Sequence, residues 1–134
     1  MLERFADKIE CGPEIDSCWE WIGAKNDKGY GSFWLGNINI KSHRFSYELY
    51  KGKIPEGLQI DHLCRNKSCC NPDHLEAVTA RINTLRGNNM ASLNSRKTHC
   101  PKGHEYNKKN TYLRKTGGRT CRECDRIRSK KGIR

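Results

Sequence analysis

The sequence predicts a small α+β protein with an antiparallel hairpin region, a strand–loop–strand–helix core and a C-terminal zinc-ribbon-like unit. Short alternating apolar segments between glycine-rich turns are typical of strands, and one connecting loop is rich in histidine and cysteine. The chain has 134 residues and eight cysteines, but only 34% of its residues are hydrophobic. So thin a core usually needs metal ions or disulfides. We therefore expect two structural zinc sites.

The cysteines are expected to bind metal rather than to form disulfides. The first eight residues lack the apolar run of a signal peptide, and no apolar segment approaches the length that spans a membrane. These observations predict a cytoplasmic protein without membrane association. In a reducing compartment, clustered cysteines favour metal binding.

The first half of the chain predicts strands and one helix. Residues 1–17 show no clear pattern. Strands with intervening turns are expected at residues 18–23, 32–35 and 38–40. Their aromatic side chains are expected to pack the hairpin region rather than to stack on bases. A helix is expected over residues 42–51, with Ser42 as its N-cap and Gly52 after its end.

The second half predicts two strands that enclose the loop rich in cysteine. They are expected at residues 58–62 and 74–78. Thr79 should then cap a helix from Ala80 to Arg86, ended by Gly87. The expected domain boundaries are an N-terminal segment 1–17, a core 18–88, a basic linker 89–98 without periodicity, and a C-terminal zinc-binding unit 99–134 with a basic tail.

The charge is concentrated in the C-terminal part. Residues 1–80 contain 10 basic against 12 acidic residues, whereas residues 81–134 contain 16 against 3, which together give the net charge of +11. A basic segment beside a nearly neutral remainder is typical of a protein that binds a polyphosphate. The alternative is a solvated basic tail.

The C-terminal unit has the spacing of a structural zinc site. Cys100 and His104 form one close pair, and Cys121 and Cys124 form another. Two local pairs that converge on one point supply the four tetrahedral ligands of zinc. His99 is an alternative ligand, but its position beside Cys100 is less favourable. Because this segment has almost no apolar residues for a core, we expect its folding to require zinc.

The central loop supplies three ligands for a second zinc ion. Cys64, Cys69 and His74 follow at five-residue intervals. The fourth ligand must come from elsewhere, and we expect Cys18, with Cys11 as the alternative. The additional thiol of Cys70 points differently from that of Cys69 and is expected to be packed or free. Without metal, the same residues would be buried thiols and a core histidine.

Three further residues suggest a catalytic constellation. Asp61 and His62 end the strand that enters the loop, and Asn83 falls in the helix expected to pack across the two strands. Asp61 and Asn83 would give oxygen ligands to a hard divalent cation, Mg²⁺ or Mn²⁺, and leave positions for water and phosphate oxygens. His62 could then take a proton from the attacking water.

About residues 18–88 resemble the HNH (ββα-metal) nucleases. The resemblance rests on Asp61-His62, on Asn71-Pro72-x-His74-Leu75 and on Val78-Thr79 followed by Asn83. Cys18-Trp19-Glu20-Trp21 with Gly29-Tyr30-Gly31 is similar to small phage-type members, and the cysteine spacing resembles that of His-Cys box homing endonucleases. The resemblance implies a ββα-metal core with His62 as general base, Asn83 and Asp61 on the catalytic metal, and a phage or mobile-element origin.

These observations predict a metal-dependent DNA endonuclease, and the resemblance implies that its products have 5′-phosphate and 3′-hydroxyl ends. One such site cuts one strand, so a double-strand break would require a homodimer or two visits. The rival hypothesis is a non-catalytic zinc module that binds nucleic acid; a redox protein built on Cys121 and Cys124 lacks the expected βαβ context. Basic residues expected to contact DNA are Arg65, Lys67, Arg86, Arg96, Lys97, Arg114, Arg119 and Arg122.

Overall fold

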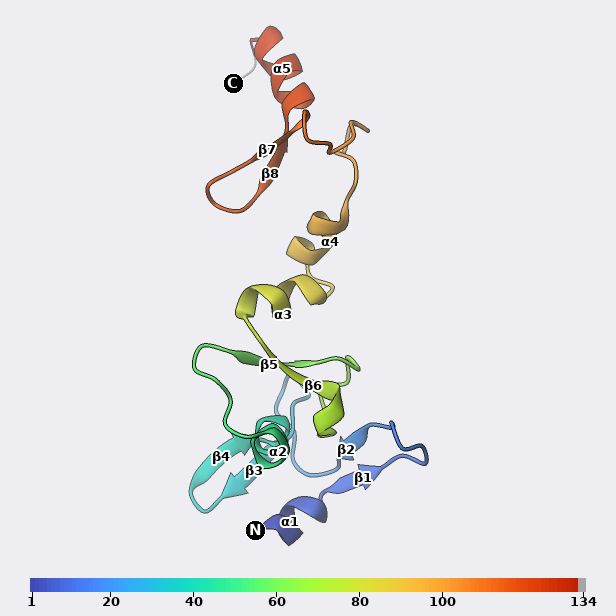
Figure 1. The fold of residues 1–134 in the computed structure, drawn as a ribbon, viewed down its shortest axis with the longest axis vertical. Helices are drawn as coiled ribbons and strands as arrows, with labels where there is room; N and C mark the ends of the chain where they lie inside the picture. The colour runs from blue at the N-terminus through green and yellow to red at the C-terminus, as the bar shows by residue number, and fades with distance from the viewer. Residues whose placement is uncertain (133–134) are drawn as a thin grey trace. The chain divides into compact units, whose positions relative to one another are not determined.

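The computed structural model describes residues 1–132. It forms two compact units, Met1–Gly87 and Asn88–Arg134 (Figure 1). The last part of the expected basic tail, residues 133–134, lies outside the described residues. Among the described residues, every helix is too short or too polar to cross a lipid bilayer.

The first unit begins with elements that the sequence pattern did not indicate. Residues 1–17 form helix α1 (Leu2–Ala6) and strand β1 (Ile9–Cys11). Strand β2 (Trp19–Trp21) pairs antiparallel with β1, so the first predicted strand does form, with a partner from the segment that showed no pattern. The other two predicted strands, β3 (Ser32–Leu35) and β4 (Ile38–Lys41), form a separate antiparallel hairpin.

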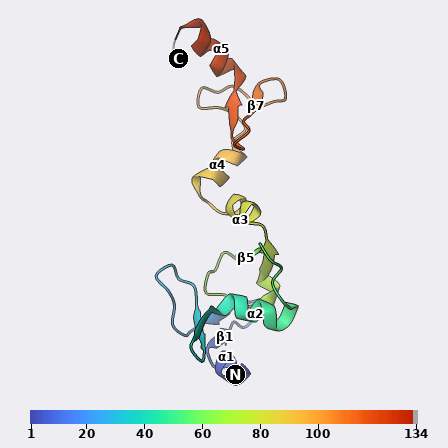
Figure 2. The same cartoon turned by 90° about the vertical axis from the view of Figure 1, so that its left-hand side faces the viewer.

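Helix α2 (Ser42–Lys51) covers the predicted residues, but its cap differs from the prediction. Lys41 is the N-cap residue and no side chain caps the helix, because Ser42 is already its first helical residue and is buried. Figure 2 shows α2 next to the N-terminal strands. Close packing there requires Gly31, since a Cβ at this position would lie 2.2 Å from Ser42 Oγ and 2.5 Å from Trp21 Cδ1.

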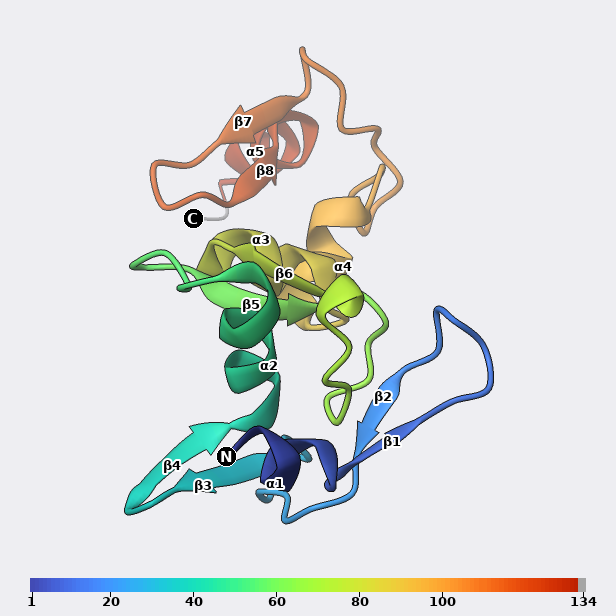
Figure 3. The same cartoon turned by 60° about the horizontal axis from the view of Figure 1, so that its bottom comes forward.

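The strand–loop–strand–helix core forms as predicted. Strand β5 (Gln59–His62) pairs antiparallel with β6 (Leu75–Val78), and the connecting loop contains a short 3-10 helix, η1 (Pro72–His74). Helix α3 (Ala80–Arg86) follows, with the Thr79 hydroxyl accepting the amide of Ile82 at 3.3 Å as its N-cap. Figure 3 shows α3 lying across this hairpin.

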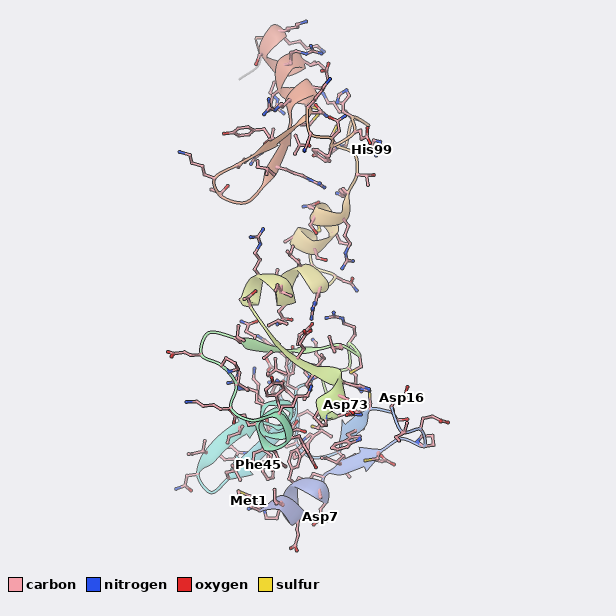
Figure 4. The ribbon with its side chains drawn as sticks, viewed as in Figure 1. Met1, Asp7, Asp16, Phe45, Asp73 and His99 are labelled. Atoms are coloured by element: carbon pink, nitrogen blue, oxygen red, sulfur yellow. The ribbon has the colours of Figure 1, made fainter. Side chains whose placement is uncertain are left out.

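Two small apolar clusters form the core of this unit. The first contains Phe5, Trp21, Phe33 and Cys70, with the half-buried Phe45 of α2 packed against it (Figure 4). The aromatic rings of Phe5 and Phe45 have centroids 4.7 Å apart. The second cluster contains Ile54, Ile60 and Leu75 at the β5–β6 hairpin. Trp21 and Phe33 are thus packing residues, as predicted.

The second unit contains more regular structure than the sequence indicated. Residues expected to be an irregular linker form helix α4 (Met90–Arg96), whose N-cap Asn89 accepts the amide of Ser92 at 2.9 Å. Strands β7 (Thr111–Leu113) and β8 (Arg119–Cys121) form an antiparallel hairpin. The expected basic tail begins as helix α5 (Arg122–Lys130), because the Cys121 thiol caps it by accepting the Cys124 amide.

Candidate active site and metal centres

Four side chains of the first unit form a cluster able to bind a metal ion. Cys18, Cys64, Cys69 and His74 each place one ligand atom within 4.8 Å of the others. The Nδ1 atom of His74 lies 3.6 Å from Cys18 Sγ and 3.5 Å from Cys69 Sγ. We refer to these four residues as the central cluster.

The loop is brought to Cys18 by backbone pairing with β2. The amide of Cys70 donates to the Trp19 carbonyl at 2.8 Å, and the amide of Trp21 donates to the Ser68 carbonyl at 2.9 Å. Asn71, which is buried, adds a side-chain bond to the Ser17 carbonyl at 2.9 Å, while its Oδ1 accepts the Asp73 amide. The Asn-Pro turn therefore fixes the position of the loop relative to the residue before Cys18.

The geometry of the central cluster fits zinc. Tetrahedral zinc with Zn–S bonds near 2.3 Å and Zn–N bonds near 2.0 Å separates sulfur from nitrogen by about 3.6 Å and two sulfurs by about 3.8 Å. The observed sulfur–nitrogen distances of 3.5 and 3.6 Å match this value. Burial raises the pKa of the Cys64 and Cys69 thiols, which are expected to release their protons when a metal binds.

The second unit contains a cluster with the same donor set. Cys100, His104, Cys121 and Cys124 form it, and their ligand atoms also lie within 4.8 Å of one another. His104 Nδ1 lies 3.5, 3.6 and 3.4 Å from the three sulfurs, and Cys100 Sγ lies 3.7 Å from Cys124 Sγ. These distances also agree with tetrahedral zinc. We refer to this set as the C-terminal cluster.

The alternative ligands lie outside both clusters. Cys11 is exposed on β1. Cys70 is buried in the first apolar cluster, where burial raises its pKa to about 11. His99, labelled in Figure 4, is exposed, and its Nδ1 lies 2.8 Å from the Thr98 hydroxyl. At each of the two centres, the structure therefore brings together the four ligands that the sequence analysis preferred over these alternatives.

His62 ends β5 as a buried, neutral histidine. Burial lowers its pKa, although a hydrogen bond to the Cys69 carbonyl and the charge of Asp61 act in the opposite direction. Its Nε2 has no hydrogen-bond partner among the described residues. A pKa below the ordinary value of about 6.5 leaves the ring unprotonated at neutral pH, so the buried Nε2 has the chemistry of a proton acceptor once water can reach it.

A second histidine, His43, lies against His62, and it was not among the predicted site residues. The ring centroids of His43 and His62 are 4.7 Å apart in an edge-to-face arrangement, and Tyr30 lies 5.4 and 5.9 Å from the two rings. Burial, followed by the charges of His62, Lys41 and Arg44, lowers the pKa of His43 to about 3. His43 is therefore uncharged at neutral pH and packs against one side of the His62 ring. Its place in α2, far from the loop in sequence, gave no signal.

Asp61 is held by two arginines. Its carboxylate is only 3% exposed; Oδ1 accepts Arg65 Nη1 at 3.0 Å and Oδ2 accepts Arg86 Nη1 at 3.1 Å. The same Arg86 nitrogen also pairs with Glu76, which lies directly opposite Asp61 in the β5–β6 register. Arg65 reaches back to Asp61 from a left-handed backbone conformation, with φ of 61°. Glu76 was not among the predicted site residues.

Asn83 lies over the same face of β5 as Asp61. Its Nδ2 donates to Gln59 Oε1 at 3.0 Å, and Gln59 precedes Asp61 by two residues and so shares its face of the strand. A buried carboxylate needs a cationic partner, and the carboxylate and carboxamide oxygens of these residues are the donors that magnesium prefers. The donor set fits a hard divalent cation, provided that an arginine leaves Asp61.

The basic residues expected to contact DNA differ in their availability. Arg122 is exposed at the start of α5. Arg119, in contrast, stacks on Tyr106 at 4.1 Å and donates to the carbonyls of Asn94 and Lys97 at the end of α4. Arg114 Nε donates to the Thr120 hydroxyl at 2.7 Å. Arg119 therefore stabilises the second unit itself.

The remaining predicted contacts are divided between the two units. Lys67 lies 5.5 Å from the Tyr30 ring, beside His62. Arg96 and Lys97 are exposed at the end of α4. Arg65 and Arg86 are partly exposed, at 50% and 36%, in spite of their ion pairs with Asp61.

Comparison with known proteins gives one family and several phage relatives. A family model described as HNH endonuclease matches residues 41–85. Protein 2.8 of Escherichia phage T7 is 35% identical over 86 residues, which cover 63% of this chain and 57% of the relative. Protein 7.7 of the same phage is 37% identical over 70 residues, covering 52% of this chain and 54% of the relative.

The match to a third relative covers a larger share of that relative's length than the matches to the two T7 proteins do. The uncharacterized gene 5.3 protein of Enterobacteria phage T3 is 33% identical over 75 residues, which cover 52% of this chain and 74% of that protein. The chain spans little more than half the length of the two T7 proteins. No solved structure matches the chain at a significant level.

Proposed function

Because the chain belongs to the HNH endonuclease family, we propose that it is a metal-dependent endonuclease that hydrolyses phosphodiester bonds of DNA. The observation that carries this proposal is His62, a buried and neutral histidine with an unpartnered Nε2, beside the buried carboxylate of Asp61. An unsatisfied buried polar atom is costly and is common at functional sites. A zinc-binding module would not need it.

In the proposed reaction, His62 acts as the general base. Its Nε2 has no hydrogen-bond partner among the described residues, and this nitrogen takes the proton from a water molecule that attacks the phosphorus in line with the 3′ oxygen. The bond to the 3′ oxygen breaks, the departing 3′ oxygen takes a proton from a solvent water molecule, and the ends that remain are a 5′-phosphate and a 3′-hydroxyl. The rings of His43 and Tyr30 fix the plane of the His62 ring, which keeps Nε2 directed at the water.

Asp61 and Asn83 would hold the divalent cation, Mg²⁺ or Mn²⁺. When bound, this ion supplies Lewis-acid stabilisation of charge on the phosphoryl and leaving oxygens. Zinc at the central cluster has an architectural role, because its ligands Cys64, Cys69 and His74 define the loop that follows His62. The loop in turn places the Cys69 carbonyl against the base.

DNA binding is assigned mainly to the second unit. Residues 88–134 contain 14 basic and 3 acidic residues, whereas residues 1–87 contain 12 of each. Contacts between basic side chains and phosphates give affinity that falls steeply with salt concentration. The first unit would then supply the chemistry and the second most of the affinity.

The test is cleavage of supercoiled plasmid by zinc-loaded protein, with and without added Mg²⁺. Nicked or linear product is expected only with Mg²⁺, and His62→Ala should lower the rate by about 10²- to 10⁴-fold, the usual contribution of a general base. His99→Ala is the matched control, because this histidine is exposed and lies outside both clusters. DNA that is bound but left intact with Mg²⁺ and with Mn²⁺ would favour the non-catalytic zinc module.

A further inference from the structure

The ion pairs of Asp61 occupy the position that a catalytic cation would need. Both carboxylate oxygens are used, one by Arg65 and one by Arg86. Asp61 is 3% exposed, so it has no room for a further ligand while both arginines remain. His62 Nε2 next to it is also shielded from solvent. A cation can therefore reach Asp61 only if one of these two ion pairs breaks.

Arg86 is the better placed of the two arginines to leave. Its Nη1 bridges Asp61 to Glu76, whose side chain is 46% exposed. Glu76 lies opposite Asp61 on the neighbouring strand, so Arg86 can lose its bond to Asp61 and keep its bond to Glu76. Arg86 stands three residues after Asn83 on α3, one helical turn away and on the same face.

We propose that Arg86 substitutes for the catalytic cation in the metal-free protein and exchanges places with it. Without a cation, the guanidinium neutralises the buried Asp61; when the cation binds Asp61, Arg86 moves toward Glu76, at the rim of the site. This inference rests on the proposed function, because it takes the Asp61 site to be the site of the catalytic cation.

The exchange makes a quantitative prediction about cation affinity. Arg86 and the cation compete for Asp61, so removal of Arg86 should tighten cation binding while it weakens the metal-free protein. A buried carboxylate that loses a partner is destabilising. A merely structural role for Arg86 would lower stability and leave cation affinity unchanged or weaker. The direction of the change in cation affinity therefore distinguishes exchange of Arg86 with the cation from a purely structural role of Arg86.

The experiment titrates zinc-loaded protein with Mn²⁺, measured by electron paramagnetic resonance. Arg86→Gln should lower the Mn²⁺ dissociation constant about tenfold, within the usual range of coupling between two ligands. It should also lower the melting temperature in the absence of Mn²⁺, and added Mn²⁺ should restore it. Arg81→Gln, an exposed arginine of the same helix, is the matched control and should change neither quantity. Asp61→Asn should abolish the site.

A second measurement needs no variant. The guanidinium signals of Arg86 in nuclear magnetic resonance spectra of the wild type should shift as Mg²⁺ is added and saturate together with those of the Asp61 carboxyl carbon. An Asp61 signal that responds to Mg²⁺ while the Arg86 signals stay unchanged would overturn the exchange. So would an Mn²⁺ dissociation constant in Arg86→Gln that equals the wild-type value.

These outcomes are independent of plasmid cleavage. If wild-type protein cleaves DNA but Arg86→Gln binds Mn²⁺ as the wild type does, the exchange alone is wrong. If the protein does not cleave DNA while Mn²⁺ displaces Arg86, the cation site stands and the proposed nuclease activity is wrong.

Discussion

The two units contain the same Cys₃His donor set but differ in the core that surrounds it. The first unit has two apolar clusters around Phe33 and Leu75 in addition to its metal-binding cluster. Among the described residues of the second unit, the buried ones are only Cys100, Cys121 and Ser92. A metal ion bound at the cluster of the first unit would therefore add to an existing core, and one bound in the second unit would take the place of a core.

Charge divides in the same way. The first unit is neutral overall, while the second carries the whole net charge of +11. A small basic segment repels itself and has little apolar surface to bury, so four metal bonds are an effective way to fold it. The comparison teaches that a metal cluster can stabilise a strongly basic segment that has too few apolar residues to form a core of its own.

Loss of a C-terminal ligand should have the largest effect. Cys121→Ser is expected to abolish hydrogen-exchange protection of β7 and β8, because binding of structural zinc contributes about 10–16 kcal/mol, more than so small a unit can replace. All three tryptophans, Trp19, Trp21 and Trp34, lie in the first unit. Their fluorescence should therefore show an unchanged thermal transition.

The control for this experiment is Cys11→Ser, which removes an exposed thiol outside both clusters. This variant should change neither the hydrogen-exchange protection of β7 and β8 nor the thermal transition followed by tryptophan fluorescence. Persistent protection of β7 and β8 in Cys121→Ser would mean that contacts such as the stacking of Arg119 on Tyr106 can hold the unit without metal.

A cavity in the first unit should have the next largest effect. Leu75 is completely buried in the cluster with Ile54 and Ile60, so Leu75→Ala should lower the free energy of unfolding by about 2–5 kcal/mol. Denaturant unfolding followed by tryptophan fluorescence measures this change, while protection of β7 and β8 should stay constant. Leu49→Ala, at a position 41% exposed on α2, should cost less than about 1 kcal/mol.

An equal loss in Leu75→Ala and Leu49→Ala would contradict the assignment of an apolar core to this unit. A simultaneous loss of protection in β7 and β8 would show that the two units unfold together, and the comparison between them would no longer hold.

The sequence predicted those parts of the molecule whose signals are local. The helix from Ala80 to Arg86 was predicted to the residue, because Thr79 and Gly87 mark its two ends. The strands around the central loop were predicted because their apolar residues alternate, and the HNH family was predicted from the motif that begins at Asp61. Each of these signals lies within a few residues of the structure that it specifies.

The parts that the sequence did not predict depend on partners distant along the chain. Strand β1 is only three residues long, too short for a reliable pattern, and it is defined by its pairing with β2. Helix α4 lacks an apolar face, and its C-terminal carbonyls are satisfied by Arg119, more than twenty residues later. In the site, His43 and Glu76 lie beside His62 and Asp61 only after α2 and β6 have packed.

The smallest expected effect concerns the division of charge. Arg122 is exposed in the second unit, and each phosphate contact contributes about 0.9 to the slope of log K against log salt for duplex DNA. Arg122→Gln should therefore reduce the magnitude of this slope by about 0.9 if the residue contacts one phosphate. Lys8→Gln removes an exposed charge from the first unit and should leave the slope unchanged. Fluorescence anisotropy at several salt concentrations gives both values, and a larger change for Lys8→Gln would assign the DNA-binding surface to the first unit instead.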